Sequence, residues 1–462
     1  MKKTSLLIVS ALISIQLVAQ ESELKANLKA TNQFDSINLN SYKQADYKQT
    51  RMSVGFGLNG GSFRNKNTST SNIQNEAFSN GSVSFSKIKS SRDYIGNQYI
   101  NFVYDAGFSV DDYVSNSDYL NEVNLGISVT TNNRFYLTNN FFYALNLQVY
   151  NTANYNLKKH NSDFYDSKEI NNDFQTSSYS SIQFGKGRTE NVTDARLAIY
   201  ILDDLIKHGR LSRTPSEKEV FEFADFITKT LNKRVIDDRI KQIMEYVAVD
   251  SFLVAKELTT KSDGLYFGLI NDNWKYARLQ DWSTGKTIYL EISPSLSYYN
   301  SLNKVDEYNV IITDQTFEHT NYGIGINLGY DSYWIKGLKR KDGFRVNSSF
   351  NLFWNHQVPN ATKSYQSLLA NIGYERSYIP NTRTYITAST LLFAGKYFNY
   401  DYYNIIINPT ISGSCNYYFS EKIRLSVNSS LFYRFGKDHS FNDYESNNLR
   451  FTISASLKYY IF

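Results

Sequence analysis

The chain has 462 residues, of which 41% are hydrophobic, 20% charged and 16% aromatic. Its formal net charge of +5 is small for this length and no basic run occurs, so nothing in the sequence indicates a nucleic-acid partner. The single cysteine, Cys415, excludes an intramolecular disulfide and a multi-cysteine zinc site. The polar average does not exclude a membrane protein, because a membrane β-barrel exposes only alternate residues to lipid.

The first 19 residues predict a secretory signal peptide. Lys2 and Lys3 precede the apolar stretch "LLIVSALISIQLVA", and cleavage is expected after Ala19. Residues 20–50 are polar and without a clear period, so we expect a flexible N-terminal segment in the periplasm. No later run reaches the roughly 18 apolar residues of a transmembrane helix, so none is predicted.

From Arg51 onward apolar residues alternate with polar ones in segment after segment. One row is Met52, Val54, Phe56 and Leu58, and the last is Phe451, Ile453, Ala455, Leu457, Tyr459 and Ile461. Six segments over 51–187 and eight over 286–462 predict about 14 strands, in a range of roughly 12–16.

Three features favour a membrane barrel over a soluble sandwich. The alternating segments run about 10 to 14 residues, whereas soluble strands cluster near 5 or 6. Aromatic residues recur at the segment ends, as interfacial girdles require. The connections alternate between long and short, which predicts external loops at 63–79, 110–120, 153–175, 300–319, 356–364, 397–403 and 436–447, and periplasmic turns at 91–97, 134–140, 379–384 and 418–423. The fold class predicted is an all-β, antiparallel, up-and-down transmembrane barrel.

Between about Gly187 and Asp281 the period changes from 2 to 3.6, which predicts an all-α insert over residues 188–285. Thr193 or Asp194 is expected to cap its first helix. "TPSEKEV" predicts Thr214 as the next cap, with Glu217 closing a capping box. Because the insert follows an even-numbered strand, it is expected in the periplasm.

The insert could cap the lower mouth of the barrel, partly fill the lumen, or project as a docking domain. We favour a cap or a docking domain, because about 95 residues of folded helix would crowd a barrel of this size. Ion pairs are expected to lock its first helix to the barrel floor, and the candidate contacts are Arg188, Glu190, Asp194 and Arg196.

The polar rows place a few charges toward the barrel interior. These lumen-facing candidates are Glu291, Asp331, Arg345, Glu375, Arg424 and Lys458. Because the set is mixed in sign, it selects neither anions nor cations. The last strand is expected to pair with the one that starts at Arg51, so that the barrel has no free edge.

No sequence motif indicates catalysis, a phosphate-binding loop or a metal site, so no cofactor and no enzyme activity are expected. His319 and His356 fall near the predicted outer rim, where a Ser/His pair would suit an outer-membrane hydrolase. Nothing beside them specifies a nucleophile or an orienting acid, so this is the distant alternative.

The signal peptide, the alternating strands and the terminal "SLKYYIF" resemble a Gram-negative outer-membrane β-barrel protein. The Asn- and Tyr-rich composition, together with "VAQ" at the cleavage site, is similar to such proteins from Bacteroidota. The resemblance implies that outer-membrane lipid and the barrel-assembly machinery are partners. It also implies that Tyr460 and Phe462 form the assembly signal, although Lys458 and Ser456 do not fit its usual phase.

The function expected is a conduit or binding lumen for a polar solute, with the periplasmic insert closing the pore or recruiting a partner. The alternative is a non-transporting outer-membrane scaffold or subunit of an envelope biogenesis or surface-export machine, which docks a periplasmic or outer-membrane protein through residues 190–280.

Overall fold

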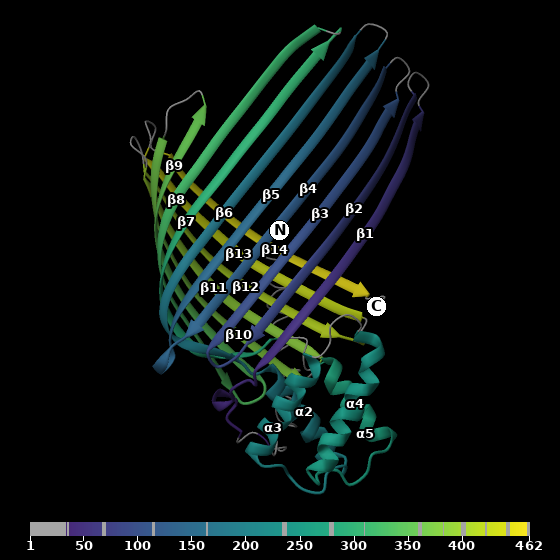
Figure 1. Ribbon diagram of the computed structural model, residues 1–462, viewed down its shortest axis with the longest axis vertical. Helices are drawn as coiled ribbons and strands as arrows, with labels where there is room; N and C mark the ends of the chain where they lie inside the picture. The colour runs from purple at the N-terminus through teal and green to yellow at the C-terminus, as the bar shows by residue number, and fades with distance from the viewer. Residues whose placement is uncertain are drawn as a thin grey trace, which may run out of the picture.

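The computed structural model describes residue 34 and residues 37–459, apart from gaps at 67–70, 113–115, 163–164, 233–237, 277–280, 309, 359–362, 382, 399–402, 421–422 and 440–443. Fourteen strands form one antiparallel sheet in which each strand pairs with its neighbours in sequence (Figure 1). They are β1 (Tyr47–Lys66), β2 (Ser71–Ser90), β3 (Tyr94–Asp112), β4 (Asn116–Tyr136), β5 (Phe141–Ser162), β6 (Asp166–Asn191), β7 (Ser283–Glu307), β8 (Val310–Lys336), β9 (Arg340–Val358), β10 (Lys363–Asn381), β11 (Thr384–Phe398), β12 (Tyr403–Tyr418), β13 (Ile423–His439) and β14 (Tyr444–Tyr459). The predicted antiparallel, up-and-down architecture is confirmed.

The strands are longer than the alternating segments indicate. β8 has 27 residues, which span about 85–90 Å at roughly 3.3 Å per residue. The long external loops predicted at 153–175 and 300–319 are wrong, because most of these residues belong to β5, β6, β7 and β8. In the halves of these strands farthest from the insert, apolar and polar residues do not alternate regularly, so the hydrophobic period disappears while the backbone ladder continues.

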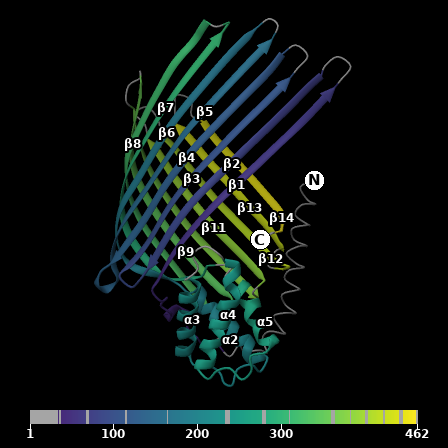
Figure 2. The same ribbon diagram turned by 45° about the vertical axis from the view of Figure 1, so that its right-hand side comes forward.

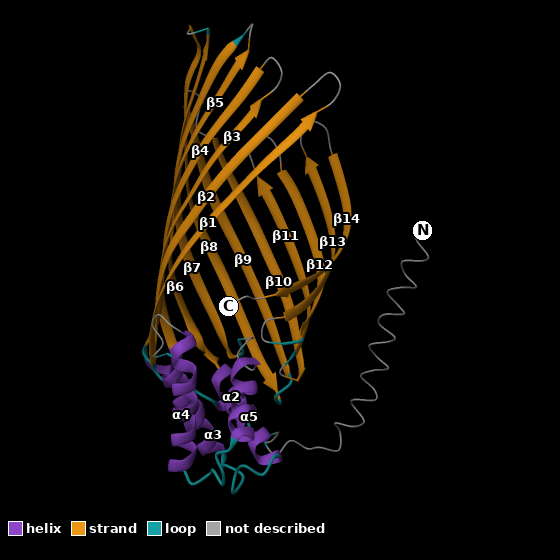
Figure 3. Cartoon of the chain, turned by 90° about the vertical axis from the view of Figure 1, so that its right-hand side faces the viewer, coloured by secondary structure: helices purple, strands orange, loops and turns teal. Residues whose placement is uncertain are grey.

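The two faces of the sheet differ in exposure. Outward apolar side chains such as Ile326 and Leu328 are 49% and 54% exposed. Alternate polar side chains such as Ser181 and Ser293 are 2% and 5% exposed, as expected on the crowded inner side of a curved sheet. Figure 3 shows the curl, with β1–β5 and β10–β14 on opposite sides. We call the inner side the polar face.

β1 and β14 are the end strands of the described sheet. Within the described residues β1 pairs with β2, β14 pairs with β13, and no pairing joins β1 to β14. Their outward side chains are correspondingly open, with Val54 70% and Leu449 68% exposed. Closure of the barrel along this seam therefore stays a prediction.

The helical insert comprises residues 192–282, a few residues shorter at each end than predicted. It contains α2 (Thr193–Lys207), α3 (Glu217–Leu231), α4 (Asp238–Ala255) and α5 (Gly264–Tyr276). The helices lie beyond the lower ends of the strands (Figures 1 and 2), as a cap or docking domain requires. Among the described residues, no helix is long and apolar enough to cross a membrane.

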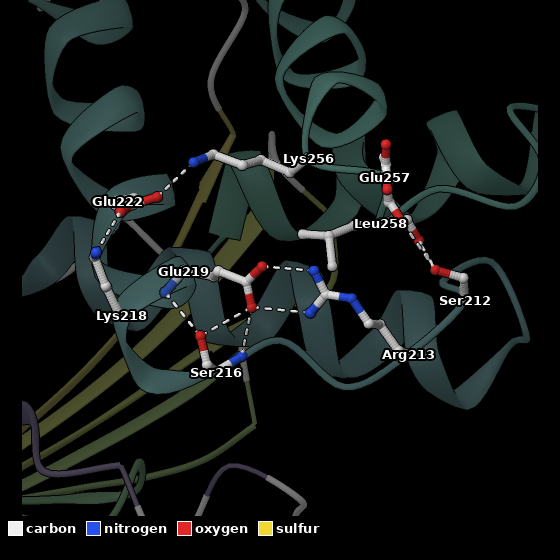
Figure 4. A network of polar contacts seen from close by, with 9 residues as sticks. All are labelled: Ser212, Arg213, Ser216, Lys218, Glu219, Glu222, Lys256, Glu257 and Leu258. Atoms are coloured by element: carbon white, nitrogen blue, oxygen red, sulfur yellow. Dashed lines mark hydrogen bonds and ion pairs between the residues drawn. The ribbon is translucent and has the colours of Figure 1, made fainter.

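Local capping explains where α2 ends and where α3 begins. Gly209, with φ of +66°, follows α2 and supplies the left-handed residue that ends it. The residue before α3 is Ser216, whose side chain and that of Glu219 form the capping box (Figure 4). The predicted cap at Thr214 is wrong by two residues, since Pro215 precedes the cap and does not occupy the first helical position.

The N-terminal segment is packed, and the flexible segment predicted over 20–50 is wrong for the residues that the structure describes there. Phe34, Leu39 and Tyr42 are at most 2% exposed and join the core of the insert. The Tyr42 hydroxyl donates to Asp225 Oδ1 at 2.9 Å. Asn40 accepts the Ile335 N–H and donates to the Ile335 carbonyl, each at 3.1 Å. We call residues 37–46 the strap, because they link the insert to the sheet.

Candidate functional site

The polar face and the helical insert beneath it form the candidate site. Strand register places all six predicted lumen residues on the polar face: Glu291, Asp331, Arg345, Glu375, Arg424 and Lys458. They lie toward the strand ends nearest the helical insert and do not form one ring. Their role in passing a solute stays a prediction.

Glu291 is the most enclosed of the six, with 8% exposure. Its carboxylate accepts the Tyr179 hydroxyl at 2.7 Å, the Asn327 side-chain amide at 2.8 Å, and the Gln183 amide. Three donors from β6 and β8 therefore hold a charge that would be costly to bury alone. Glu291 therefore links β6, β7 and β8 through side-chain hydrogen bonds.

Asp331 and Arg345 face each other across β8 and β9, with Arg345 Nε 3.7 Å from Asp331 Oδ1. Arg345 also donates to the Tyr333 hydroxyl at 2.5 Å. Arg424 and Lys458 are opposite each other on β13 and β14, so two cations share the last pair of strands. Neighbouring like charges favour a hydrated lining over a dry interior.

Acidic and basic side chains are unevenly distributed over the polar face. By strand parity, acidic side chains dominate β2–β8: Glu76, Asp105, Asp111, Asp118, Glu122, Glu169, Asp173, Glu291 and Asp331. Basic side chains dominate β9–β14: Arg345, Arg424, Arg434, Arg450 and Lys458. This separation became visible only once the register was known.

Two of the predicted insert contacts, Arg188 and Glu190, belong to β6 and not to the insert. Arg188 donates to the backbone carbonyls of Arg92 at 2.6 Å and Ser91 at 2.9 Å, and its Nε lies 3.0 Å from Glu190 Oε1. Arg92 pairs with Glu190 at 2.6 Å and donates to the Gln44 carbonyl of the strap at 2.9 Å. This ion-pair network ties β6 to the β2–β3 turn and the strap.

Arg196 does join α2 to the sheet, but through other contacts than the predicted ion pair. Its side chain is 2% exposed and lies 4.2 Å from the Trp282 ring and 4.9 Å from the Tyr200 ring. Its Nε donates to the Leu338 carbonyl, in the turn between β8 and β9, at 3.3 Å. Arg196 is therefore held by aromatic faces and a backbone oxygen.

The prediction is wrong for Asp194. This residue is 3% exposed and accepts a hydrogen bond from Thr228 Oγ1 at 2.8 Å, which joins α2 to α3 inside the insert. The apolar contact between insert and sheet comes from Trp282, Ile335, Leu338 and Ile379, each at most 5% exposed. The insert is thus seated on the ends of β7 to β10.

One ion pair fixes the start of α3, and another joins α3 to the residue after α4 (Figure 4). Glu219 accepts both Arg213 guanidinium nitrogens, at 2.6 and 2.9 Å, and these bonds lower the pKa of Glu219 to about 2. Lys256 directly follows α4, and its Nζ lies 2.6 Å from Glu222 Oε2 of α3. This contact lowers the pKa of the Glu222 carboxyl.

The two histidines singled out from the sequence lie on opposite faces of the sheet. His319 belongs to the polar face and His356 to the apolar face, as the pairing of Thr320 with His356 requires. Another contact, which has no signature in the sequence, lies at the strand ends farthest from the insert, where His160 Nδ1 is 2.5 Å from Asp118 Oδ1. The described residues contain no group of His, Cys, Asp and Glu placed to hold a metal ion. Tyr460 and Phe462, the predicted assembly signal, lie outside the described residues.

Comparisons with known proteins complete the description of the site. No family model matches the chain, and no curated protein matches it. Similar solved structures include the translocator domain of autotransporter NalP from Neisseria meningitidis, with 8% identity over 87% of this chain and 98% of that chain and a TM-score of 0.23. The ferric yersiniabactin uptake receptor FyuA from Yersinia pestis has 6% identity over 89% and 68% of the two chains, with a TM-score of 0.30. The toluene transporter TodX from Pseudomonas putida has 7% identity over 93% and 94%, with a TM-score of 0.25. At these TM-scores the likeness carries no argument about function.

Proposed function

We propose that the protein is an outer-membrane β-barrel of a Gram-negative cell whose polar face lines a conduit or binding lumen for a polar solute. In this proposal the helical insert sits in the periplasm and restricts the lower mouth. Outer-membrane lipid and the barrel-assembly machinery are its general partners, and it catalyses no reaction. The observation that carries the proposal is the division of 14 long strands into an exposed apolar face and an enclosed polar face.

The length of the apolar rows supports a membrane position. On β9 the outward row runs from Phe344 to Trp354, a distance of ten residue steps that covers about 33 Å along the strand. A strand tilt of roughly 35–45° reduces this to about 25 Å, the height of the apolar band of an outer-membrane barrel. Aromatic pairs mark both ends, with Tyr330 and Phe344 6.3 Å apart below and Tyr322 stacked on Trp354 at 5.4 Å above.

The attachment of the insert supports a cap. The insert is fixed to the ends of β7 to β10 through Trp282, Leu338 and Ile379, and the strap adds Asn40. Its helices lie outside the span of the strands (Figure 3), which leaves the polar face free along its length. Movement or removal of the insert would therefore open the lower mouth without changing the wall.

The test is the conductance of the purified protein in planar lipid bilayers, with and without the insert. Asn191 and Ser283 are directly paired, so a two-residue turn can replace residues 192–282 without changing the register. We expect channel conductance to rise in the shortened chain, whereas Ile243→Ser, an exposed position 72% open to solvent, should leave it unchanged. No conductance in either chain, with heat-modifiable migration showing that both sheets are folded, would reject the conduit.

A docking scaffold is the second candidate, and an exposed stripe on α4 favours it. Ile243, Met244, Val247 and Val254 are 47–72% exposed and lie along one side of the helix. Contiguous apolar surface on a water-exposed domain is typical of a protein-binding site. A partner that co-purifies with the native chain and is lost in an Ile243→Ser, Val247→Ser double variant would favour this function.

A further inference from the structure

A cavity of about 420 Å³ lies on the polar face between β5 and β10. Its walls are aromatic: Tyr150 and Tyr179 stand on β5 and β6, and Phe353 and Tyr365 stand on β9 and β10. Its floor is made of small side chains on the strands between them, among them Ser295 and Ser297 of β7. The volume is within the range of small-molecule sites, roughly 300–1,000 Å³.

The strand register explains why the cavity forms. One continuous row across the sheet reads Gln148, Tyr179, Ser295, Gly323, Phe353 and Tyr365. The next row reads Tyr150, Ser177, Ser297 and Asn321. The first row has rings toward both ends and the second has one ring at its β5 end, with small groups between these rings, which hollows the wall.

The aromatic walls are held in place and remain accessible. Phe353 stacks on Tyr365 with ring centroids 5.0 Å apart and planes at 21°. A Cβ at Gly323 would lie 2.6 Å from Phe353 Cδ1, so only glycine leaves room for this ring. The Tyr179 hydroxyl is fixed by Glu291, yet Tyr150, Tyr179 and Tyr365 stay 37–42% exposed.

The lining selects one class of solute. Among the described residues that line the cavity none is charged, so a charged solute would lose water without gaining a countercharge. A purely apolar solute would leave the serine hydroxyls and the Gln148 and Asn321 amides without partners. A sugar matches both parts, because its hydroxyls can pair with these groups while its C–H faces pack on the rings.

We infer that this cavity is a binding site for a neutral saccharide, on the route that the proposed conduit provides. The inference deepens the proposed function and rests on the polar face being open to the solute. Tyr150 and Tyr365 act as stacking platforms on opposite walls, and Gln148 and Asn321 supply hydrogen bonds between them.

The test is calorimetric titration of the detergent-folded full chain with neutral cellotriose and maltotriose, and with negatively charged trigalacturonate. We expect one neutral trisaccharide to bind better than the charged one. Tyr150→Ala and Tyr365→Ala should each raise its Kd about tenfold, since one aromatic stacking contact is worth roughly that factor. Tyr99→Ala is the matched control, because Tyr99 is 38% exposed on the polar face of β3 and lies outside the cavity.

Three results would overturn the inference: no binding of either neutral trisaccharide, tighter binding of trigalacturonate, or equal loss of affinity in the Tyr99 variant. Conductance measured on the same preparation separates the two proposals. A conducting channel that binds no neutral trisaccharide leaves the conduit standing and removes the saccharide site. Saccharide binding without conductance would leave the saccharide site standing and reject the conduit.

Discussion

Replacing Arg196 by Met tests how the insert is attached to the sheet. Methionine keeps most of the buried stem but removes the cation and its donors. Losing a desolvated cation–π contact with Trp282 costs about 2 kcal/mol. Weakening the bond to the Leu338 carbonyl costs about 1 kcal/mol, the low end of the range, because the Tyr200 hydroxyl lies 3.4 Å from the same oxygen. The substitution also removes a buried cation that has no carboxylate partner in the described part of the chain, and this gain offsets part of the two losses. The net loss of stability is then about 2 kcal/mol.

The assay is limited proteolysis of the detergent-folded protein with proteinase K. When opening and closing are fast relative to cleavage, the cleavage rate follows the open fraction of the insert. A loss of about 2 kcal/mol raises that fraction roughly 30-fold. Cleavage within 192–282 should accelerate to that extent, while heat-modifiable migration of the sheet stays unchanged. Lys218→Met, at a side chain 87% exposed on α3, is the control. An Arg196→Met insert cut no faster than the Lys218 control would refute this account of the anchor.

Three further predictions concern the strap, the cap of α3 and the seam. Asn40→Ala should expose the strap to protease and destabilise the insert by about 1–3 kcal/mol, because both polar groups of Ile335 lose their partner; unchanged protection would contradict this. Glu219, with its pKa lowered from 4.5 to about 2, contributes stability that is present above pH 4.5 and lost as pH falls toward 2. Denaturant titration of the insert should therefore show Glu219→Gln about 1 kcal/mol less stable at pH 7 and less sensitive to acid, and parallel pH profiles would argue against the pairing. In a Cys415→Ser background, cysteine pairs placed along β1 and β14 should include one that forms a disulfide, since a closed seam brings opposite Cα atoms to about 4.5–5.5 Å; no cross-link in any pair would mean an open sheet.

The alternation of side chains was sufficient to predict the sheet. Wherever one face is apolar, as in Tyr322 to Tyr330 of β8, the period of two identifies the strand and the face. The outer half of the same strand begins "VIITDQTFEH", where apolar residues do not alternate. There the strand is held by backbone pairing with β7, which leaves no pattern in the sequence. The loops predicted in these regions were wrong for that reason.

The insert could be recognised from its 3.6-residue period, whereas its contacts could not. Arg196 was identified as a contact, but its partners are an aromatic ring 86 positions away and a backbone carbonyl, and neither has a signature in the sequence. The packing of the strap and of the nearby Phe34 was missed, because Phe34, Leu39 and Tyr42 are irregularly spaced in a polar segment. The aromatic cavity combines six strands, so it follows only from their register.

The account is tested most directly by the accessibility of single cysteines along β8, in a Cys415→Ser background, in reconstituted lipid bilayers. Ile324, Ile326 and Leu328 belong to the apolar face, and Gly325 and Asn327 to the polar face. We predict that cysteines at the polar positions react with a water-soluble maleimide. Spectroscopic labels at the apolar positions should instead be quenched by a lipid-dissolved nitroxide, so that the two signals alternate residue by residue. Equal accessibility to water at both sets of positions would contradict a lipid-facing wall around an aqueous lumen.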